Sequence, residues 1–149
     1  MKIVKAKCSD IPGIIKLNSS NAKCMELSKW ITDIHVIKYE YVTNPFAIYY
    51  VIKHRNKVIA GLALDFSESN IDIIVVDEKW QGKGLGTQLI NKACESVKEE
   101  EGPCIKVGSF DKFDAISFYE KLGFKKTDHQ LDPSNENKEY WTELTKDLS

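Results

Sequence analysis

Runs of apolar residues with the composition of β-strands recur along the chain. The segments 46–53 (FAIYYVIK) and 57–66 (KVIAGLALDF) are rich in β-branched and aromatic residues, and only the polar turn HRN separates them. Such a pair predicts an antiparallel hairpin. Further strands are expected at 3–7, 70–76, 104–110, 124–131 and 139–145.

Apolar residues three and four positions apart predict helices between these strands. The longest apolar face runs over 85–97, and Gly102-Pro103 ends it. A first helix is expected after Asp10, with Pro12 in its first turn. Residues 23–41 favour an irregular helix, and Asp111 is predicted to cap a short helix within 115–122.

The alternation of these elements favours one mixed sheet with helices on its faces. With 149 residues, 42% of them hydrophobic, the chain can bury one sizeable core but is unlikely to divide into two. It contains no internal repeat and no linker-like stretch. We therefore expect a single domain over residues 1–149.

Net charge restricts the classes of partner. The formal net charge is −1, and acidic and basic residues are mixed along the chain. This balance argues against nucleic-acid binding, which depends on positive surfaces. The amino-terminal segment lacks the apolar stretch of a signal peptide, and no segment has the apolar length that a membrane span needs. A cytoplasmic protein without membrane contact is expected.

The residue types that commonly bind metals are scattered. The four cysteines form no CxxC pair, and the three histidines lie in different segments without HxH or HExxH spacing. No metal site is predicted.

Three glycines at alternate positions stand where a helix is expected to begin. Gly82, Gly84 and Gly86 follow the strand-like run IDIIVVDEKW. Inside a helix each glycine costs about 0.8–1 kcal/mol relative to alanine, so the segment has another requirement for bare backbone. A strand that leads into a helix leaves unpaired N–H groups at the helix start, and glycines let an anion approach them.

Spacing decides among the anion-binding loops. A dinucleotide-binding GxGxxG needs glycine where the chain has Thr87, and the P-loop pattern GxxxxGK[ST] is absent. A Q-x-x-G-x-G run from Gln81 to Gly86 remains. Taken alone, these glycines also fit a tight turn that binds no ligand.

The run QGKGLG resembles the pyrophosphate loop, Q/R-x-x-G-x-G/A, of the GNAT superfamily of N-acetyltransferases. The preceding IDIIVVDEKW is similar to the central strand of that family, and SFYEKLGF (117–124) is similar to its helix that carries a tyrosine and ends in Gly-Phe. The resemblance spans nearly the whole chain and is weakest in the first third. It implies an α/β (α+β) fold, a mixed, mostly antiparallel twisted sheet flanked by helices.

The resemblance also implies acetyl transfer from acetyl-CoA to an amine. The end of the central strand, at Ile74, Val75 and Val76, would pair with the pantetheine arm and direct an N–H group toward the thioester oxygen. Lys112 stands where many members carry an asparagine near the cofactor. Loop residues would hold the pyrophosphate: Gln81, Gly82, Lys83, Gly84, Leu85, Gly86 and Thr87.

Acetyl transfer to an amine poses two proton-transfer problems. An alkylamine with a pKa of about 10.4 must lose a proton before it attacks, and the departing thiolate must gain one. By resemblance Tyr119 would supply the second proton, although a tyrosine at helical spacing is also an ordinary core residue.

The candidate general base comes from the polar residues on one side of the central strand. Asp72, Asn70 and Glu68 share that side, and we take Asp72 as the candidate base, acting directly or through water. Some members of the family use a glutamate on the following strand, where this chain has Val107.

Three functions compete. They are an acetyltransferase for a small-molecule amine, one for a protein or peptide amine, and a catalytically degenerate module that binds acyl-CoA. The first is preferred, and the resemblance implies that a homodimer can form. Four aromatic residues line an acceptor pocket or fill the core, and core filling is the favoured interpretation: Trp30, Tyr39, Tyr41 and Tyr49.

Overall fold

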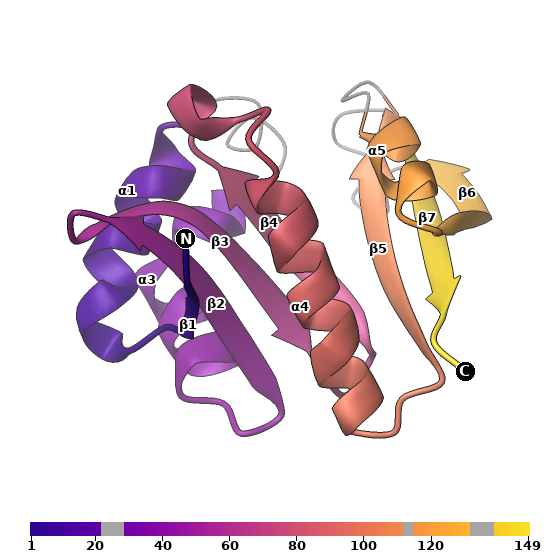
Figure 1. Cartoon of the computed structure of the whole chain (residues 1–149), viewed down its shortest axis with the longest axis horizontal. Helices are drawn as coiled ribbons and strands as arrows, with labels where there is room; N and C mark the ends of the chain where they lie inside the picture. The colour runs from indigo at the N-terminus through magenta and orange to yellow at the C-terminus, as the bar shows by residue number, and fades with distance from the viewer. Residues whose placement is uncertain (22–28, 112–114, 132–138) are drawn as a thin grey trace.

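A seven-stranded sheet in the order β1-β2-β3-β4-β5-β7-β6 organises the chain in a computed structural model that describes residues 1–21, 29–111, 115–131 and 139–149 (Figure 1). Neighbouring strands are antiparallel except β4 and β5, which are parallel. The predicted mixed, mostly antiparallel sheet is confirmed. The strands are β1 (Ile3–Lys5), β2 (Ala47–His54), β3 (Lys57–Asp65), β4 (Asn70–Val76), β5 (Cys104–Phe110), β6 (Lys125–Leu131) and β7 (Tyr140–Asp147).

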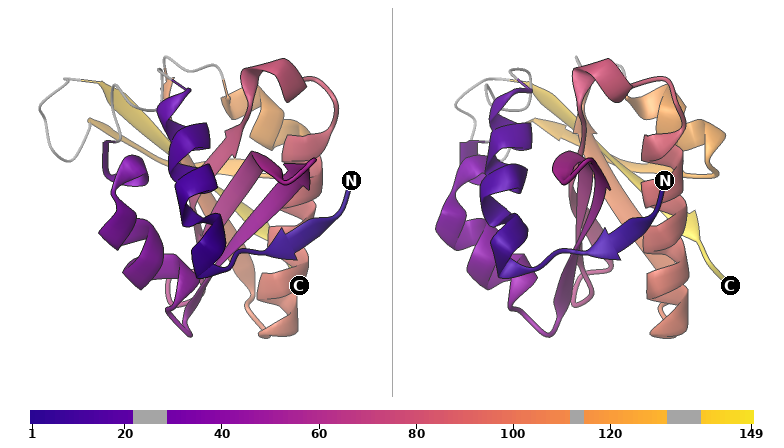
Figure 2. Two further views of the ribbon diagram at one scale, coloured as in Figure 1. Left: turned by 90° about the vertical axis from the view of Figure 1, so that its left-hand side faces the viewer. Right: turned by 60° about the vertical axis from the view of Figure 1, so that its left-hand side comes forward.

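Helices cover both faces of the sheet (Figure 2). One core cluster joins α1 and η3 to one face, and a second joins α4 and α5 to the other. In the described ranges, no helix is long and apolar enough to cross a membrane. The helical segments are η1 (Cys8–Asp10), α1 (Ile11–Ser19), η2 (Lys29–Thr32), α3 (Ile34–Val36), the π-helical η3 (Ile37–Val42), η4 (Glu78–Trp80), α4 (Leu85–Glu99) and α5 (Ile116–Lys121).

The helices form where the apolar spacing predicted them, but one predicted N-terminal capping residue is wrong. The apolar face of α4 is buried from Leu85 to Val97, and residues 29–42 form the expected irregular helix from short pieces, while 22–28 lie outside the described residues. The capping role of Asp111 is wrong. Helix α5 begins only at Ile116, and the Asp111 carboxylate instead accepts hydrogen bonds from His129 and Thr142.

The parallel pair β4–β5 is short. Only Asn70 with Lys106 and Ile71 with Val107 are in register, and beyond them the two strands separate (Figure 1). Over 72–76, no strand in the described ranges pairs with the edge of β4 that faces β5, which is called the unpaired edge below.

A β-bulge in β4 lies at the same point. Ala63 of β3 opposes Ile73 and Leu64 opposes Ile71, so Asp72 has no partner on β3. The extra residue shifts the alternation of side chains. Ile71 packs in the cluster beneath α4, whereas Ile73, two residues later, packs in the cluster beneath α1.

Candidate active site

The glycine loop connects η4 to α4. Gly84 is the N-cap residue of α4 with a φ of 83°, and Gly82 has a φ of 76°, both in the left-handed region that favours glycine. A Cβ atom at either position would meet no atom within 4 Å. The backbone conformation therefore accounts for both glycines, and the space beside them is open.

The start of α4 presents unpaired donors to this open space. No described side chain caps the helix, so the N–H groups of Leu85, Gly86 and Thr87 are available, and the helix dipole adds partial positive charge. Gln81 Nε2 donates a hydrogen bond of 3.1 Å to the carbonyl oxygen of Val76, which ties the loop to β4. Lys83 is exposed beside the loop. The geometry suits an anion such as a phosphate.

The unpaired edge of β4 leads from the loop toward Asp72. Ile74, Val75 and Val76 pair with β3. On the edge that faces β5 no described strand pairs with them, and the Val76 carbonyl oxygen there accepts the hydrogen bond from Gln81. An extended ligand can add to such an edge as a strand does. The pairing of these three residues with a pantetheine arm, which the resemblance implies, stays a prediction.

Asp72 is held at the point where β4 separates from β5. Its Oδ2 accepts a hydrogen bond of 2.8 Å from Tyr41 Oη, and its Oδ1 accepts one of 2.5 Å from Asn70 Nδ2. Tyr41 belongs to η3, so the bond joins the helical layer to the sheet. Asn70 and Asp72 therefore share one side of β4, as the sequence indicated.

The surroundings of Asp72 favour its protonated form. Burial raises the pKa of the Asp72 carboxyl group above its usual range; the hydrogen bonds from Asn70 and Tyr41 oppose the rise, and the charges of Asp65 and Glu40 add to it. Burial and the Asp72 charge also raise the pKa of Tyr41, so its hydroxyl stays a donor. A carboxylate with a raised pKa takes up a proton more readily, as a general base must.

Tyr119 lies on α5 with its side chain only 5% exposed. Its ring contacts those of Phe118 and Phe124 edge to face, with centroid distances of 5.3 and 5.9 Å, in the core cluster beneath α4. This packing fits the interpretation of Tyr119 as a core residue, and its catalytic role stays a prediction. Lys112 lies outside the described residues. Val107 is buried in the same cluster and offers no base.

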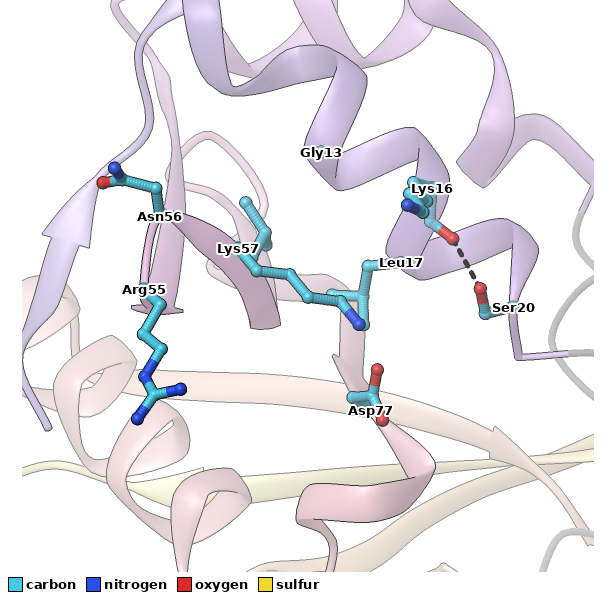
Figure 3. Close-up of a pocket in the computed structure, with 9 residues that line it drawn as sticks. Gly13, Lys16, Leu17, Ser20, Arg55, Asn56, Lys57 and Asp77 are labelled. Carbon is cyan, nitrogen blue, oxygen red and sulfur yellow. Dashed lines mark hydrogen bonds between the residues drawn. The ribbon is translucent and has the colours of Figure 1, made fainter.

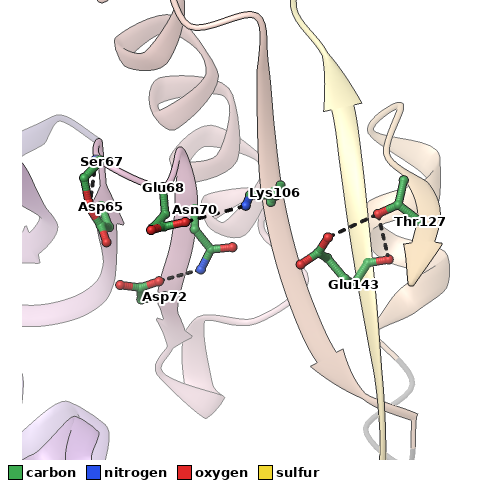
Figure 4. A network of polar contacts seen from close by, with 8 residues as sticks. All are labelled: Asp65, Ser67, Glu68, Asn70, Asp72, Lys106, Thr127 and Glu143. Carbon is green, nitrogen blue, oxygen red and sulfur yellow. Dashed lines mark hydrogen bonds and ion pairs between the residues drawn. The ribbon is translucent and has the colours of Figure 1, made fainter. Parts of the chain in front are cut away.

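Two cavities share Asp72. They have volumes of about 280 and about 450 Å³, and both are lined by Asn70, Asp72 and Trp141. Figure 4 shows polar side chains of β4, β5 and β7 around the smaller one. The smaller cavity is further lined by Glu68, Lys106, Gly108 and Glu143, and the larger by Trp30, Glu40, Tyr41 and Ile71.

Trp141 forms a wall common to both cavities. A Cβ atom added at Gly108 would overlap the indole ring, which shows that the ring lies directly against the backbone at this position. Phe110 contacts the indole edge to face with a centroid distance of 4.8 Å. The absence of a side chain at Gly108 therefore lets Trp141 lie over β5 beside Asp72.

Sequence reasoning missed several residues of these cavities. Core filling is confirmed for Tyr49, whereas Trp30 and Tyr39 are 41% and 59% exposed, so that expectation is wrong for both. Tyr41 is buried, yet it also lines the larger cavity and binds Asp72. No local signal marked the cavity residues Glu143 and Trp141, because β7 meets β4 only through the folded sheet.

A third cavity lies away from Asp72, between α1 and the turn that joins β2 to β3. It has a volume of about 400 Å³, and Lys16, Arg55 and Lys57 are among its lining residues. Figure 3 shows Lys57 extending toward Asp77. None of the predicted site residues lines this cavity. The residues in the described ranges contain no group of three or more His, Cys, Asp or Glu side chains that could hold a metal ion.

Comparison with known proteins gives a consistent family. The family model of the acetyltransferase (GNAT) domain matches residues 45–126, which is more than half of the chain. A glucosamine 6-phosphate N-acetyltransferase of Trypanosoma brucei brucei is 39% identical over 62 residues, which are 42% of this chain and 41% of that protein. The chain matches about half or less of the first two curated relatives, 49% and 41% of their lengths.

Solved structures share the fold over the whole chain. The ribosomal-protein-S18-alanine N-acetyltransferase of Escherichia coli has a TM-score of 0.82 at 15% identity, covering 99% of this chain and 94% of that one. An aminoglycoside 6'-N-acetyltransferase complexed with coenzyme A has a TM-score of 0.78 at 16% identity, covering 100% and 98%. The match of the family model to more than half of the chain, together with the glycine loop and the separated strands, shows that this protein belongs to the GNAT family of acetyltransferases.

Proposed function

We propose that this protein transfers the acetyl group of acetyl-CoA to a primary amine of a small molecule by direct attack of the amine on the thioester. The observation that carries the proposal is the unpaired edge of β4. It runs from the open glycine loop at one end to Asp72 and the two cavities at the other. We further propose that one acetyltransferase domain spans residues 1–149.

The loop and the strand edge divide the binding of acetyl-CoA between them. The N–H groups at the start of α4 bind the pyrophosphate, with Lys83 adding positive charge and Gln81 holding the loop against Val76. The β4 edge at Ile74, Val75 and Val76 pairs with the pantetheine arm. One of its N–H groups stabilises the oxyanion that forms at the thioester carbonyl.

Two side chains handle the protons in this proposal. Asp72 accepts a proton from the acceptor ammonium group, directly or through water, and the freed amine forms a C–N bond with the acetyl carbonyl carbon. The C–S bond then breaks as Tyr119 donates a hydrogen bond or a proton to the departing thiolate. The nitrogen loses its second proton to water or to the Tyr119 oxygen, so that one proton is released overall. The products are the N-acetylated amine and CoA.

A small acceptor is favoured over a protein. The cavities beside Asp72 have the size of small-ligand sites, and two of the similar proteins carry the names of amino-sugar and aminoglycoside acetyltransferases. The S18-alanine N-acetyltransferase, whose acceptor is a protein, keeps the alternative of a protein or peptide amine open to test.

Two measurements test the proposal. Acetyl-CoA and CoA should raise the melting temperature more than equal concentrations of NAD or ATP do, because a ligand selective for the native state stabilises it. Release of free CoA with a panel of small amines and peptides then identifies the acceptor class. A preference for NAD would contradict cofactor binding, and acetyl-CoA binding without CoA release on any amine would indicate a degenerate binding module.

A further inference from the structure

Four carboxyl groups line the two cavities around Asp72, which is more than a single amine group would need as partners. Glu40 lines the larger cavity, Glu68 and Glu143 line the smaller, and Asp72 lines both. The lining residues include one cation, Lys106, whose Nζ lies 4.0 Å from Glu68 Oε2. Within the described part of the chain, no lysine, arginine or histidine forms an ion pair with Glu40, Asp72 or Glu143.

The hydrogen-bond partners of Glu143 and Asp72 are neutral side chains, so they do not balance the charge of these carboxyl groups. Glu143 Oε1 accepts a long hydrogen bond of 3.5 Å from Thr127 Oγ1, and Asp72 accepts one from Asn70 (Figure 4). Asp72 also accepts a hydrogen bond from Tyr41. Three aromatic residues, Trp30, Tyr41 and Trp141, line the larger cavity together with Glu40 and Asp72. Carboxylates next to aromatic faces suit an alkylammonium group, which a ring face attracts and a carboxylate pairs with.

We propose that the acceptor is a polycationic amine, whose reacting nitrogen lies at Asp72 while a further ammonium group is bound by Glu143 in the smaller cavity or by Glu40 in the larger. This inference deepens the proposed function and depends on it for the identity of the reacting nitrogen. The same charges disfavour an anionic acceptor such as a phosphorylated amino sugar, because its phosphate would lie among carboxylates.

Binding to the CoA complex tests the inference without needing turnover. Putrescine and n-butylamine share a four-carbon chain and differ by one ammonium group. By isothermal titration calorimetry, putrescine should bind the CoA-saturated protein about 10-fold more tightly, the scale of one or two partly exposed ion pairs. The preference should shrink as salt is added, because salt screens exposed charges. Glucosamine 6-phosphate should bind more weakly than n-butylamine.

Charge-neutral variants assign the preference to residues. Glu143→Gln and Glu40→Gln should each reduce putrescine affinity, by about 5-fold for the residue that pairs with the second ammonium, and leave n-butylamine affinity nearly unchanged. Glu99→Gln, which makes the same change on the exposed end of α4, is the control and should alter neither affinity.

The outcomes separate this inference from the proposed function. Equal affinity for the two amines, or a putrescine preference that survives in the Glu40→Gln, Glu143→Gln double variant, would overturn the polycation inference even if n-butylamine is acetylated. A preference that disappears in the double variant supports it. Failure of every bound amine to cause CoA release would overturn the proposed catalysis and leave the charge recognition standing.

Discussion

The two halves of the candidate site are built in different ways. The cofactor half consists of consecutive residues, from the end of β4 through the glycine loop into the first turn of α4. The acceptor half collects Tyr41 from η3, Asp72 from β4 and Trp141 from β7, which are far apart in the sequence. Backbone recognition can therefore be encoded by neighbouring residues, whereas a pocket lined by particular side chains requires the completed sheet.

The largest expected effect lies in the acceptor half. Asp72→Asn removes the proposed base while keeping a side chain that can bond Tyr41 and Asn70. We expect kcat/KM for the amine to fall by about 10²- to 10⁴-fold, the range of general acid–base catalysis, with acetyl-CoA affinity little changed. In the unaltered protein, the rate should decline as the pH falls through the raised pKa of Asp72, because the base must be ionised. A pH–rate profile of the variant that retains this decline would assign it to another group.

Tyr119→Phe tests whether the buried tyrosine of α5, which lies outside the consecutive residues of the cofactor half, takes part in the chemistry. The ring and its contacts with Phe118 and Phe124 are kept, so we expect a folded protein with normal acetyl-CoA affinity and kcat lower by about 10²-fold, the lower end for a general acid.

Tyr50→Phe is the matched control for this variant. Tyr50 is buried in the same cluster, and its hydroxyl bonds Ser96 Oγ at 2.6 Å, so its loss should lower stability but not kcat. If chemistry limits the rate and Tyr119→Phe leaves kcat unchanged, Tyr119 is a packing residue.

Gly84→Val should damage the cofactor half selectively. A β-branched residue at a φ of 83° is strained, and its side chain enters the open space beside the loop. The free loop of the variant should relax to a conformation that valine prefers by about 1–2 kcal/mol, which binding must reverse, so we expect Kd for acetyl-CoA, measured by calorimetry, to rise by about 10-fold or more.

Asn56→Val separates loss of the loop from general destabilisation. Asn56 has a φ of 63° in the turn between β2 and β3, so valine introduces similar strain away from the loop. It should lower the melting temperature and leave the Kd for acetyl-CoA unchanged. An equal loss of affinity in both variants would mean that strain, rather than access to the loop, controls cofactor binding.

The smallest effect is expected from losing the hydrogen bond between Tyr41 and Asp72, which joins the helical layer to the sheet. Tyr41→Phe removes a hydrogen bond that lowers the pKa of Asp72, so that pKa rises further and the acidic limb of the pH–rate profile moves to higher pH. The rate on that limb should fall by about 2- to 10-fold, as expected for one hydrogen bond. Tyr49→Phe is the control, since Tyr49 packs edge to face against Tyr41 without bonding Asp72. A limb that stays in place in Tyr41→Phe would show that the bond does not tune Asp72.

The sequence alone determined the elements of the sheet and the cofactor loop. Strand composition located the β2–β3 hairpin and the central strand, and the apolar face of α4 predicted its burial. The positions of Gly82 and Gly84 indicated a requirement for bare backbone, and in the structure both have positive φ. These features depend on residues close together in the chain, whose conformational preferences act before any distant contact forms.

Only the tertiary structure decided which residues form the acceptor half and where β4 separates from β5. Periodicity predicts that Ile71 and Ile73 face the same side, but the bulge at Asp72 places them in different clusters, because register depends on the partner strand. Asp111 has the sequence of a cap, yet its carboxylate bonds residues of β6 and β7. The sequence already placed Glu68 near Asp72, but Glu40 and Glu143 join them only in the folded sheet, since local sequence does not determine which distant side chains will share a cavity.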